Sequence, residues 1–120
     1  MKKILLVEDE PILRKNIARF LRGKGQAVVC ATDTDEAFPL LKGGSIDLLI
    51  TDLVLPSGKG FALLEEATRR GLKAIVITAY GSQQLEEQLR AEGVFAYLEK
   101  PFEVETLYRL VEKAEGPWAR

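Results

Sequence analysis

Polar side chains close four short, mainly apolar runs in this chain. Each run ends at residues that can bind a metal ion or a phosphoryl group: Glu8 and Asp9 after residues 4–7, Asp52 after 48–51, Thr78 after 74–77 and Lys100 after 97–99. If the runs are parallel strands of one sheet, all these side chains meet at its carboxyl edge, where open α/β sheets place their sites. A cluster of carboxylates facing a lysine can bind a hard divalent ion and support phosphoryl transfer.

Taken singly, each of these residues has a purely structural explanation. Glu8 and Asp9 suit the start of a helix, where negative charge complements the helix dipole. Asp52 suits a turn before Pro56. Most lysines are solvated, and threonine is common in strands for packing reasons alone. The hypothesis of a shared site therefore depends on the repetition of one plan at several strand ends.

The composition is that of one ordinary globular domain. The chain has 120 residues, of which 47% are hydrophobic and 29% charged, with a formal net charge of -1. This balance argues against nucleic acid or an anionic membrane as the main partner. The basic and apolar start at residues 2–7 meets acidic residues too soon to be a signal peptide, so we expect a cytoplasmic protein.

Two residue counts narrow the chemistry further. The single cysteine, Cys30, excludes an internal disulfide, and its apolar neighbours favour a small packed side chain over a reactive thiol. The chain contains no histidine. Histidine base catalysis, imidazole-dependent zinc sites and phosphohistidine carried by this chain are therefore excluded.

Apolar runs alternate with stretches of helical period, the pattern of βαβ units. Strands are expected at residues 3–7, 27–31, 47–51, 73–77 and 95–98. Helices are expected at 11–22, from 33–35 to 43–44, between 60 and 71, between 81 and 93, and from about 104 to 116. Pro39 lies inside the second helix, where it removes a backbone donor and normally causes a kink.

Five βα units with short loops predict a doubly wound α/β fold. We expect a three-layer, flavodoxin-like sandwich with a five-stranded parallel sheet in the order 2-1-3-4-5 and five helices. This order places the first and third strands side by side at the switch point. Glu8, Asp9 and Asp52 then fall together, so the predicted site depends on this pairing.

The same segments resemble the receiver domain of two-component response regulators. The resemblance covers essentially the whole chain, in order and spacing, and is carried by residues 4–10 (ILLVEDE), 48–56 (LLITDLVLP), 76–80 (VITAY) and 97–102 (YLEKPF). The last two segments are most similar to receivers of the nitrogen-regulation class or to single-domain receivers. The chain retains every polar residue that this pattern requires.

The resemblance implies that Asp52 accepts a phosphoryl group from a partner histidine kinase or phosphotransfer protein. Lys100 and Thr78 would bind the phosphoryl oxygens. A Mg²⁺ or Mn²⁺ ion would be held by Glu8, Asp9, Asp52 and the backbone carbonyl of Val54.

The resemblance also implies a conformational switch. Thr78 and Tyr97 would move together when Asp52 is modified. The affected surface would consist of the helix at 81–93, the strand at 95–98 and the last helix, and it would bind a downstream target protein, an output domain or a second copy of the chain.

Two other function classes can be weighed against this one. An aspartyl-phosphate phosphatase is disfavoured, because the chain lacks inserted cap segments and has Val54, not an acid, two residues after Asp52. A receiver-fold interaction module that is not phosphorylated is the alternative. We therefore expect a phosphoacceptor switch and not an enzyme with a separate substrate, with a domain at residues 1–116 and a tail at 117–120.

Overall fold

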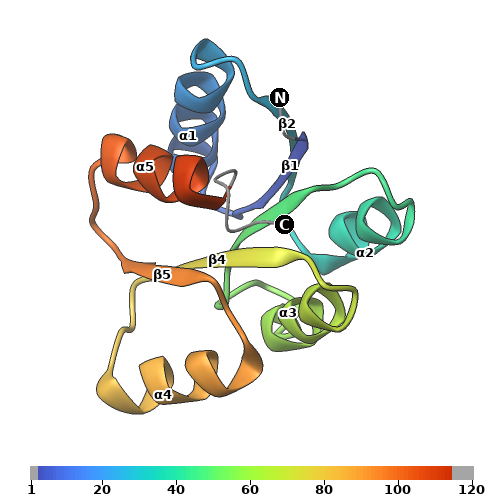
Figure 1. The fold of residues 1–120 in the computed structure, drawn as a ribbon, viewed down its shortest axis with the longest axis vertical. Coiled ribbons are helices and arrows are strands. Elements are labelled where there is room, and N and C mark those ends of the chain that lie inside the picture. The colour runs from blue at the N-terminus through green and yellow to red at the C-terminus, as the bar shows by residue number, and fades with distance from the viewer. Residues whose placement is uncertain (1–2, 115–120) are drawn as a thin grey trace.

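The structure, a computed structural model, describes residues 3–114 as a parallel sheet with helices on both faces (Figure 1). The five strands, in the order β2-β1-β3-β4-β5, are β1 (Lys3–Val7), β2 (Ala27–Ala31), β3 (Leu48–Asp52), β4 (Lys73–Thr78) and β5 (Ala96–Glu99). The doubly wound fold and its strand order are confirmed. The predicted domain end at residue 116 and the tail at 117–120 lie outside the described residues.

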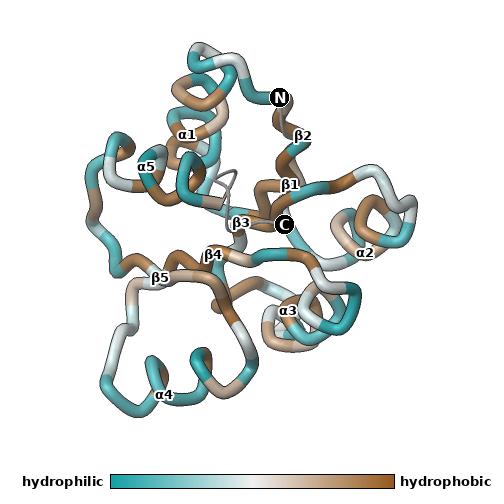
Figure 2. The backbone as a smooth tube through the Cα atoms, viewed as in Figure 1, coloured by the Kyte–Doolittle hydropathy of each residue, from teal (hydrophilic) through white to brown (hydrophobic). Residues whose placement is uncertain are grey.

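The strands are buried because both faces of the sheet are covered. Ile4 and Leu6 of β1 pack into one hydrophobic cluster, whereas Leu5 and Val7 pack into another on the opposite face. Successive side chains of a strand point to opposite faces, so a strand covered on both sides must be apolar throughout. Figure 2 shows this as hydrophobic colour along much of the strands and mixed colour along the helices.

Five helices fill the outer layers: α1 (Pro11–Gly23), α2 (Thr34–Lys42), α3 (Gly60–Arg69), α4 (Gln83–Glu92) and α5 (Val104–Ala114). Helices α1 and α5 pack on one face of the sheet, and α2 and α3 on the other (Figure 1). Helix α4 is the most polar of the five and buries only Leu89 among its residues. It lies beside β5, at one end of the sheet.

The local sequence explains where several helices begin. The carboxylate of Glu10 accepts hydrogen bonds from the backbone nitrogens of Ile12 and Leu13, and Pro11 occupies the first helical position. Ser82 Oγ accepts from Leu85 N at 3.0 Å at the start of α4. These side chains satisfy backbone donors that have no partner within the helix.

Small differences from the predicted elements have local causes. Helix α2 is continuous through Pro39, whose carbonyl accepts from Gly43 N at 3.0 Å. Asp52 is the last residue of β3, because the pairing of β3 with β4 extends to Asp52 opposite Ile77. Strand β5 starts one residue later than expected. No helix within residues 3–114 is long and apolar enough to cross a membrane.

The start of α3 lies directly against the loop that follows β3. Gly60 is buried, and a Cβ atom placed on it would lie 2.2 Å from the carbonyl oxygen of Leu53. No real carbon atom tolerates that distance from backbone. Only glycine therefore lets α3 approach the residue next to Asp52.

We expect Gly60→Ala to lower the free energy of unfolding by about 1–3 kcal/mol, since helix and loop must move apart. Gly23→Ala is the matched control, because nothing lies within 4 Å of a Cβ at that position. Urea denaturation of both variants measures the effect. Equal stability of the two variants would contradict the close-approach argument.

Candidate functional site

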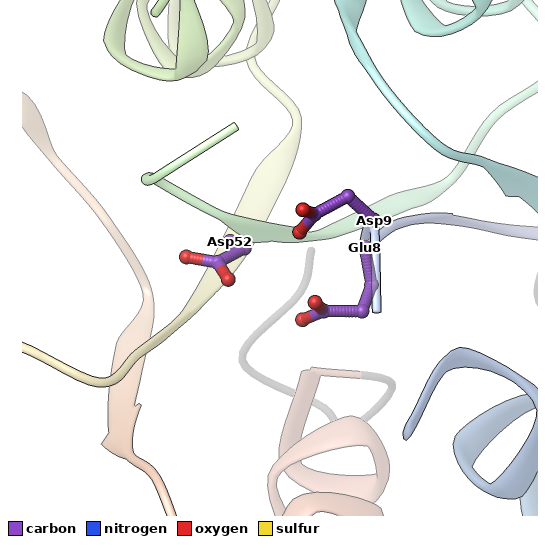
Figure 3. Close-up of side chains that lie close together, drawn as sticks. All are labelled: Glu8, Asp9 and Asp52. Carbon is purple, nitrogen blue, oxygen red and sulfur yellow. The ribbon is translucent and has the colours of Figure 1, made fainter. Parts of the chain in front are cut away.

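Three carboxylates gather at the carboxyl edge of the sheet. Parallel pairing places Val7 of β1 opposite Thr51 of β3, so Glu8 and Asp52, each one residue further along, are neighbours. Glu8, Asp9 and Asp52 each offer an oxygen within 4.8 Å of the others. Figure 3 shows the side chains of Glu8 and Asp9 extending side by side toward Asp52. The sequence predicted that these three residues lie close together, and the structure shows them close together.

Lys100 extends into this cluster from the end of β5. Its Nζ donates a hydrogen bond to Asp52 Oδ2 at 2.7 Å and forms an ion pair with Glu8 Oε1 at 2.9 Å. Its backbone nitrogen donates to the carbonyl of Thr78 at 2.7 Å, and the Lys100–Pro101 peptide bond is cis. One ammonium thus contacts carboxylates that follow two different strands.

Both oxygens of the Asp52 carboxylate are held. Lys100 holds Oδ2, and the backbone nitrogen of Val54 donates to Oδ1 at 3.0 Å. The residue is buried, with 5% of its surface exposed. Hydrogen bonds to both oxygens fix the orientation of the carboxylate, which is what a positioned nucleophile requires.

Glu8 is fully buried, with 0% of its surface exposed. Burial raises its pKa above the usual value of 4.5, and its contacts with Lys100 and with the backbone of Glu10 offset this only in part. The pKa of Lys100 is also raised, but here burial works against the shift. Burial acts to lower it, but the hydrogen bonds and charges of Asp52 and Glu8 together prevail and hold it above its usual value.

The donor set fits a hard divalent cation. Three carboxylates with one ammonium leave an excess of negative charge in a small space. Oxygen donors of this kind suit Mg²⁺, which takes few carboxylates and retains several water molecules. Glu8 Oε1 is buried and, among the described residues, has only the Lys100 ammonium at 2.9 Å as a polar partner, so this oxygen keeps accepting capacity. Asp9 is exposed, which leaves one side of the cluster open.

Two further predicted residues, Thr78 and Val54, lie next to Asp52, one in the neighbouring strand and one in the loop that follows β3. Asp52 pairs with Ile77, so Thr78 comes one residue further along the neighbouring strand. Thr78 is buried, and its Oγ accepts from Tyr80 N at 3.1 Å. Val54 is 55% exposed beside Asp52.

Tyr97 lies away from the carboxylates, in β5 opposite Val76. It is half-buried and lines a surface cavity between α4 and β5 together with Gly81, Glu86 and Glu99. The structure therefore places one member of the predicted switch pair at the site and the other beneath α4.

Sequence reasoning missed two groups of residues that hold the site loops. Arg14 of α1 donates to the backbone carbonyl of Glu8 at 2.8 Å. Asp33, which caps α2, accepts from Ser57 N at 2.9 Å and so ties the start of α2 to the loop after β3. Both are hydrogen bonds between a side chain and the backbone of a different segment, and such bonds leave no periodic pattern in a sequence.

We expect wild type to lose stability relative to Glu8→Gln as the pH rises above 4.5 without metal. The pKa of the Glu8 carboxyl is 4.5 in the unfolded chain and higher in the fold, so its stabilising contribution is lost as the pH rises through the folded pKa. Urea denaturation across this range measures the difference. Glu87→Gln removes the same charge from an exposed position as a control. A difference between wild type and Glu8→Gln that is constant or increases with pH would refute the assignment.

Comparison with known proteins supports the interpretation of this edge. Residues 4–112 match the response regulator receiver domain family. The chain is 36% identical over 115 residues to the transcriptional regulatory protein PdtaR of Mycobacterium tuberculosis, covering 94% of this chain and 56% of that protein. It is 33% identical to GlrR of Escherichia coli, covering 92% of this chain and 26% of that protein. The chain thus spans about half, or less, of these relatives.

Solved structures agree with the sequence comparison. The non-phosphorylated receiver domain of HemR from Leptospira biflexa superposes with a TM-score of 0.88 at 29% identity, covering 94% of this chain and 93% of that one. A two-component response regulator from Clostridium difficile, at 22% identity and a TM-score of 0.91, shares the fold. From the family match and the shared architecture, the chain belongs to the response regulator receiver domains of two-component systems.

Proposed function

We propose that this domain is a phosphorylation-dependent switch in which Asp52 is the phosphoacceptor. The observation that carries the proposal is the Lys100 ammonium, which contacts both Asp52 and Glu8 inside a three-carboxylate cluster. Receiver domains interact with histidine kinases and with output domains. We propose that the donor is a phosphohistidine on a kinase or phosphotransfer protein; this chain has no histidine that could carry it.

In the proposed reaction an Asp52 oxygen attacks the phosphorus atom of the donor. A P–O bond forms as the P–N bond to the donor imidazole breaks, and the imidazole leaves as nitrogen base. Val54 N and Lys100 Nζ hold the Asp52 carboxylate in place before transfer. Lys100 then stabilises the charge on the transferred oxygens, and Thr78 Oγ binds one of them.

Receiver domains bind Mg²⁺ at an acidic pocket, and the cluster here supplies such a pocket. We propose that Glu8, Asp9, Asp52 and the backbone carbonyl of Val54 hold Mg²⁺, with Mn²⁺ as a substitute. An ion held there would supply positive charge between the carboxylates and the incoming phosphoryl group. The chain itself keeps these carboxylate oxygens close together, although two of the three carboxylates, those of Glu8 and Asp52, are buried.

The switch that we propose links Thr78 to the surface of α4, β5 and α5. Thr78 Oγ holds Tyr80 N, so its movement toward a phosphoryl oxygen releases the loop before α4. Gly81 follows directly, and a Cβ on it would lie 2.6 Å from Glu99 Oε1, so this loop is in close contact with β5. Tyr97 lies in the same cavity as both residues and moves with them.

The output of the switch is an altered surface for a partner. Helix α4 buries only Leu89, so a shift of this helix disturbs little of the core. We propose that this surface binds a downstream target, an output domain or a second copy of the chain. The domain then acts as a population-shifted switch, not as an enzyme on a separate substrate.

Incubation with Mg²⁺ and a small phosphodonor such as acetyl phosphate is expected to add one phosphoryl group to wild type and none to Asp52→Asn. The substitution removes the nucleophilic carboxylate and keeps its size. Intact mass measured soon after mixing reports the modification.

Omission of Mg²⁺ or addition of a chelator is the control and should prevent the gain in mass. A folded wild type that gains no phosphoryl group under any of these conditions would support the non-phosphorylated interaction module instead. Equal gain in Asp52→Asn would place the acceptor elsewhere.

Thr78→Ala is expected to retain phosphorylation at Asp52 but to lose most of the accompanying change at α4, β5 and α5. The variant lacks the hydroxyl that connects the site to Tyr80. Backbone amide chemical shifts with and without the phosphodonor measure the change residue by residue.

Thr106→Ala makes the same chemical change at an exposed position of α5 and should respond like wild type. If Thr78→Ala shows shifts of the same size as wild type across this surface, the hydroxyl does not transmit the signal.

A further inference from the structure

A basic side chain lies behind the acidic loop that supplies two of the three carboxylates. Arg14, in the first turn of α1, donates through one guanidinium nitrogen to the backbone carbonyl of Glu8 at 2.8 Å and to that of Asp9 at 3.4 Å. The first bond is partly buried, and Glu8 itself is inaccessible to solvent. Arg14 thus binds the peptide backbone of the two residues whose side chains enter the cluster.

The loop needs such support because its own side chains repel one another. Three consecutive acidic residues, 8–10, follow β1. Glu8 N donates to the carbonyl of Ala31 at 3.0 Å, and Glu10 N donates to Glu8 Oε2 at 3.1 Å. These bonds fix Glu8 and Glu10, but within residues 3–114 neither the backbone nitrogen nor the side chain of Asp9 makes such a bond. Among those contacts Arg14 is the one that reaches the Asp9 backbone.

We propose that Arg14 is a positioning residue for the metal-binding carboxylates of Glu8 and Asp9. The inference rests on the proposed Mg²⁺ site. Arg14 would contact neither the metal nor the phosphoryl group and would act through the backbone of the loop. By holding both carbonyls on the α1 side of the loop, the guanidinium keeps both side chains directed toward Asp52. One guanidinium nitrogen carries two N–H donors in a fixed plane and serves both carbonyls, whereas a lysine ammonium is a more flexible point charge.

Positioning can be separated from simple charge by the sign of the effect. A nearby positive charge repels Mg²⁺, so loss of Arg14 through charge alone would tighten metal binding. Loss of positioning lets Glu8 and Asp9 move apart and would weaken it. The two explanations therefore predict opposite changes in the dissociation constant.

The experiment measures the dissociation constant for Mg²⁺ by calorimetric titration of the unphosphorylated domain. Arg14→Met keeps much of the aliphatic stem and removes every donor, and Arg14→Lys keeps the charge. Lys15→Met is the matched control, because it removes one positive charge from the next, exposed position of α1. Urea denaturation without metal reports whether each variant remains folded.

We expect Arg14→Met to raise the dissociation constant about tenfold, the lower range for loss of a group that orients metal ligands. Arg14→Lys should give a smaller increase, and Lys15→Met should be unchanged or slightly tighter. If Arg14→Met does not fold, an increase in Arg14→Lys at unchanged unfolding free energy carries the same conclusion.

Binding by Arg14→Met that is equal to or tighter than wild type would overturn the inference, as would equal weakening in Lys15→Met. In either case wild type still binds Mg²⁺ and the proposed function stands. Absence of Mg²⁺ binding in folded wild type would overturn the metal site and the role of Arg14 together.

Discussion

The ion pairing of Lys100 with Asp52 and Glu8 is the interaction on which the site depends. Three carboxylates with oxygens within 4.8 Å of one another repel, and two of them, Glu8 and Asp52, are buried. Burial of an unpaired charge is costly, so this edge of the sheet is stable only if a cation shares the space. Lys100 supplies it from the opposite side, at the end of β5, with distances of 2.7 and 2.9 Å. The strand order that brings β1, β3 and β5 to one edge therefore matters for charge as well as for packing.

The same pairing explains why the domain can be both stable and reactive. Lys100 holds the Asp52 carboxylate, yet it compensates Glu8 incompletely, and the pKa of Glu8 stays raised by burial. The cluster holds three carboxylates and one ammonium, so a divalent cation can neutralise the remaining negative charge. A fully neutralised cluster would leave less electrostatic advantage for metal binding. This excess of negative charge is consistent with the chemistry that we propose. An arriving phosphoryl group adds further negative charge, which a divalent cation at the carboxylates would neutralise.

Much of this arrangement could be predicted from the sequence, because it follows from periodicity. Continuous apolar runs indicated strands covered on both faces, and the position of Glu8, Asp9, Asp52 and Lys100 after them placed these residues at one edge. Loop contacts could not be predicted in the same way. The bonds of Arg14 to the Glu8 carbonyl and of Asp33 to Ser57 depend on backbone direction in turns. The approach of Gly60 to Leu53 likewise depends on how closely α3 packs, which no spacing encodes.

The thin attachment of α4 has a thermodynamic consequence for the whole domain. Its one buried side chain, Leu89, is a small share of a core that is otherwise held by the sheet and the other helices. Local opening of such an element costs less free energy than global unfolding. Helix α4 can then open while the sheet and the other helices stay folded. A signal carried by α4 can be large in amplitude while the rest of the domain keeps its full resistance to unfolding.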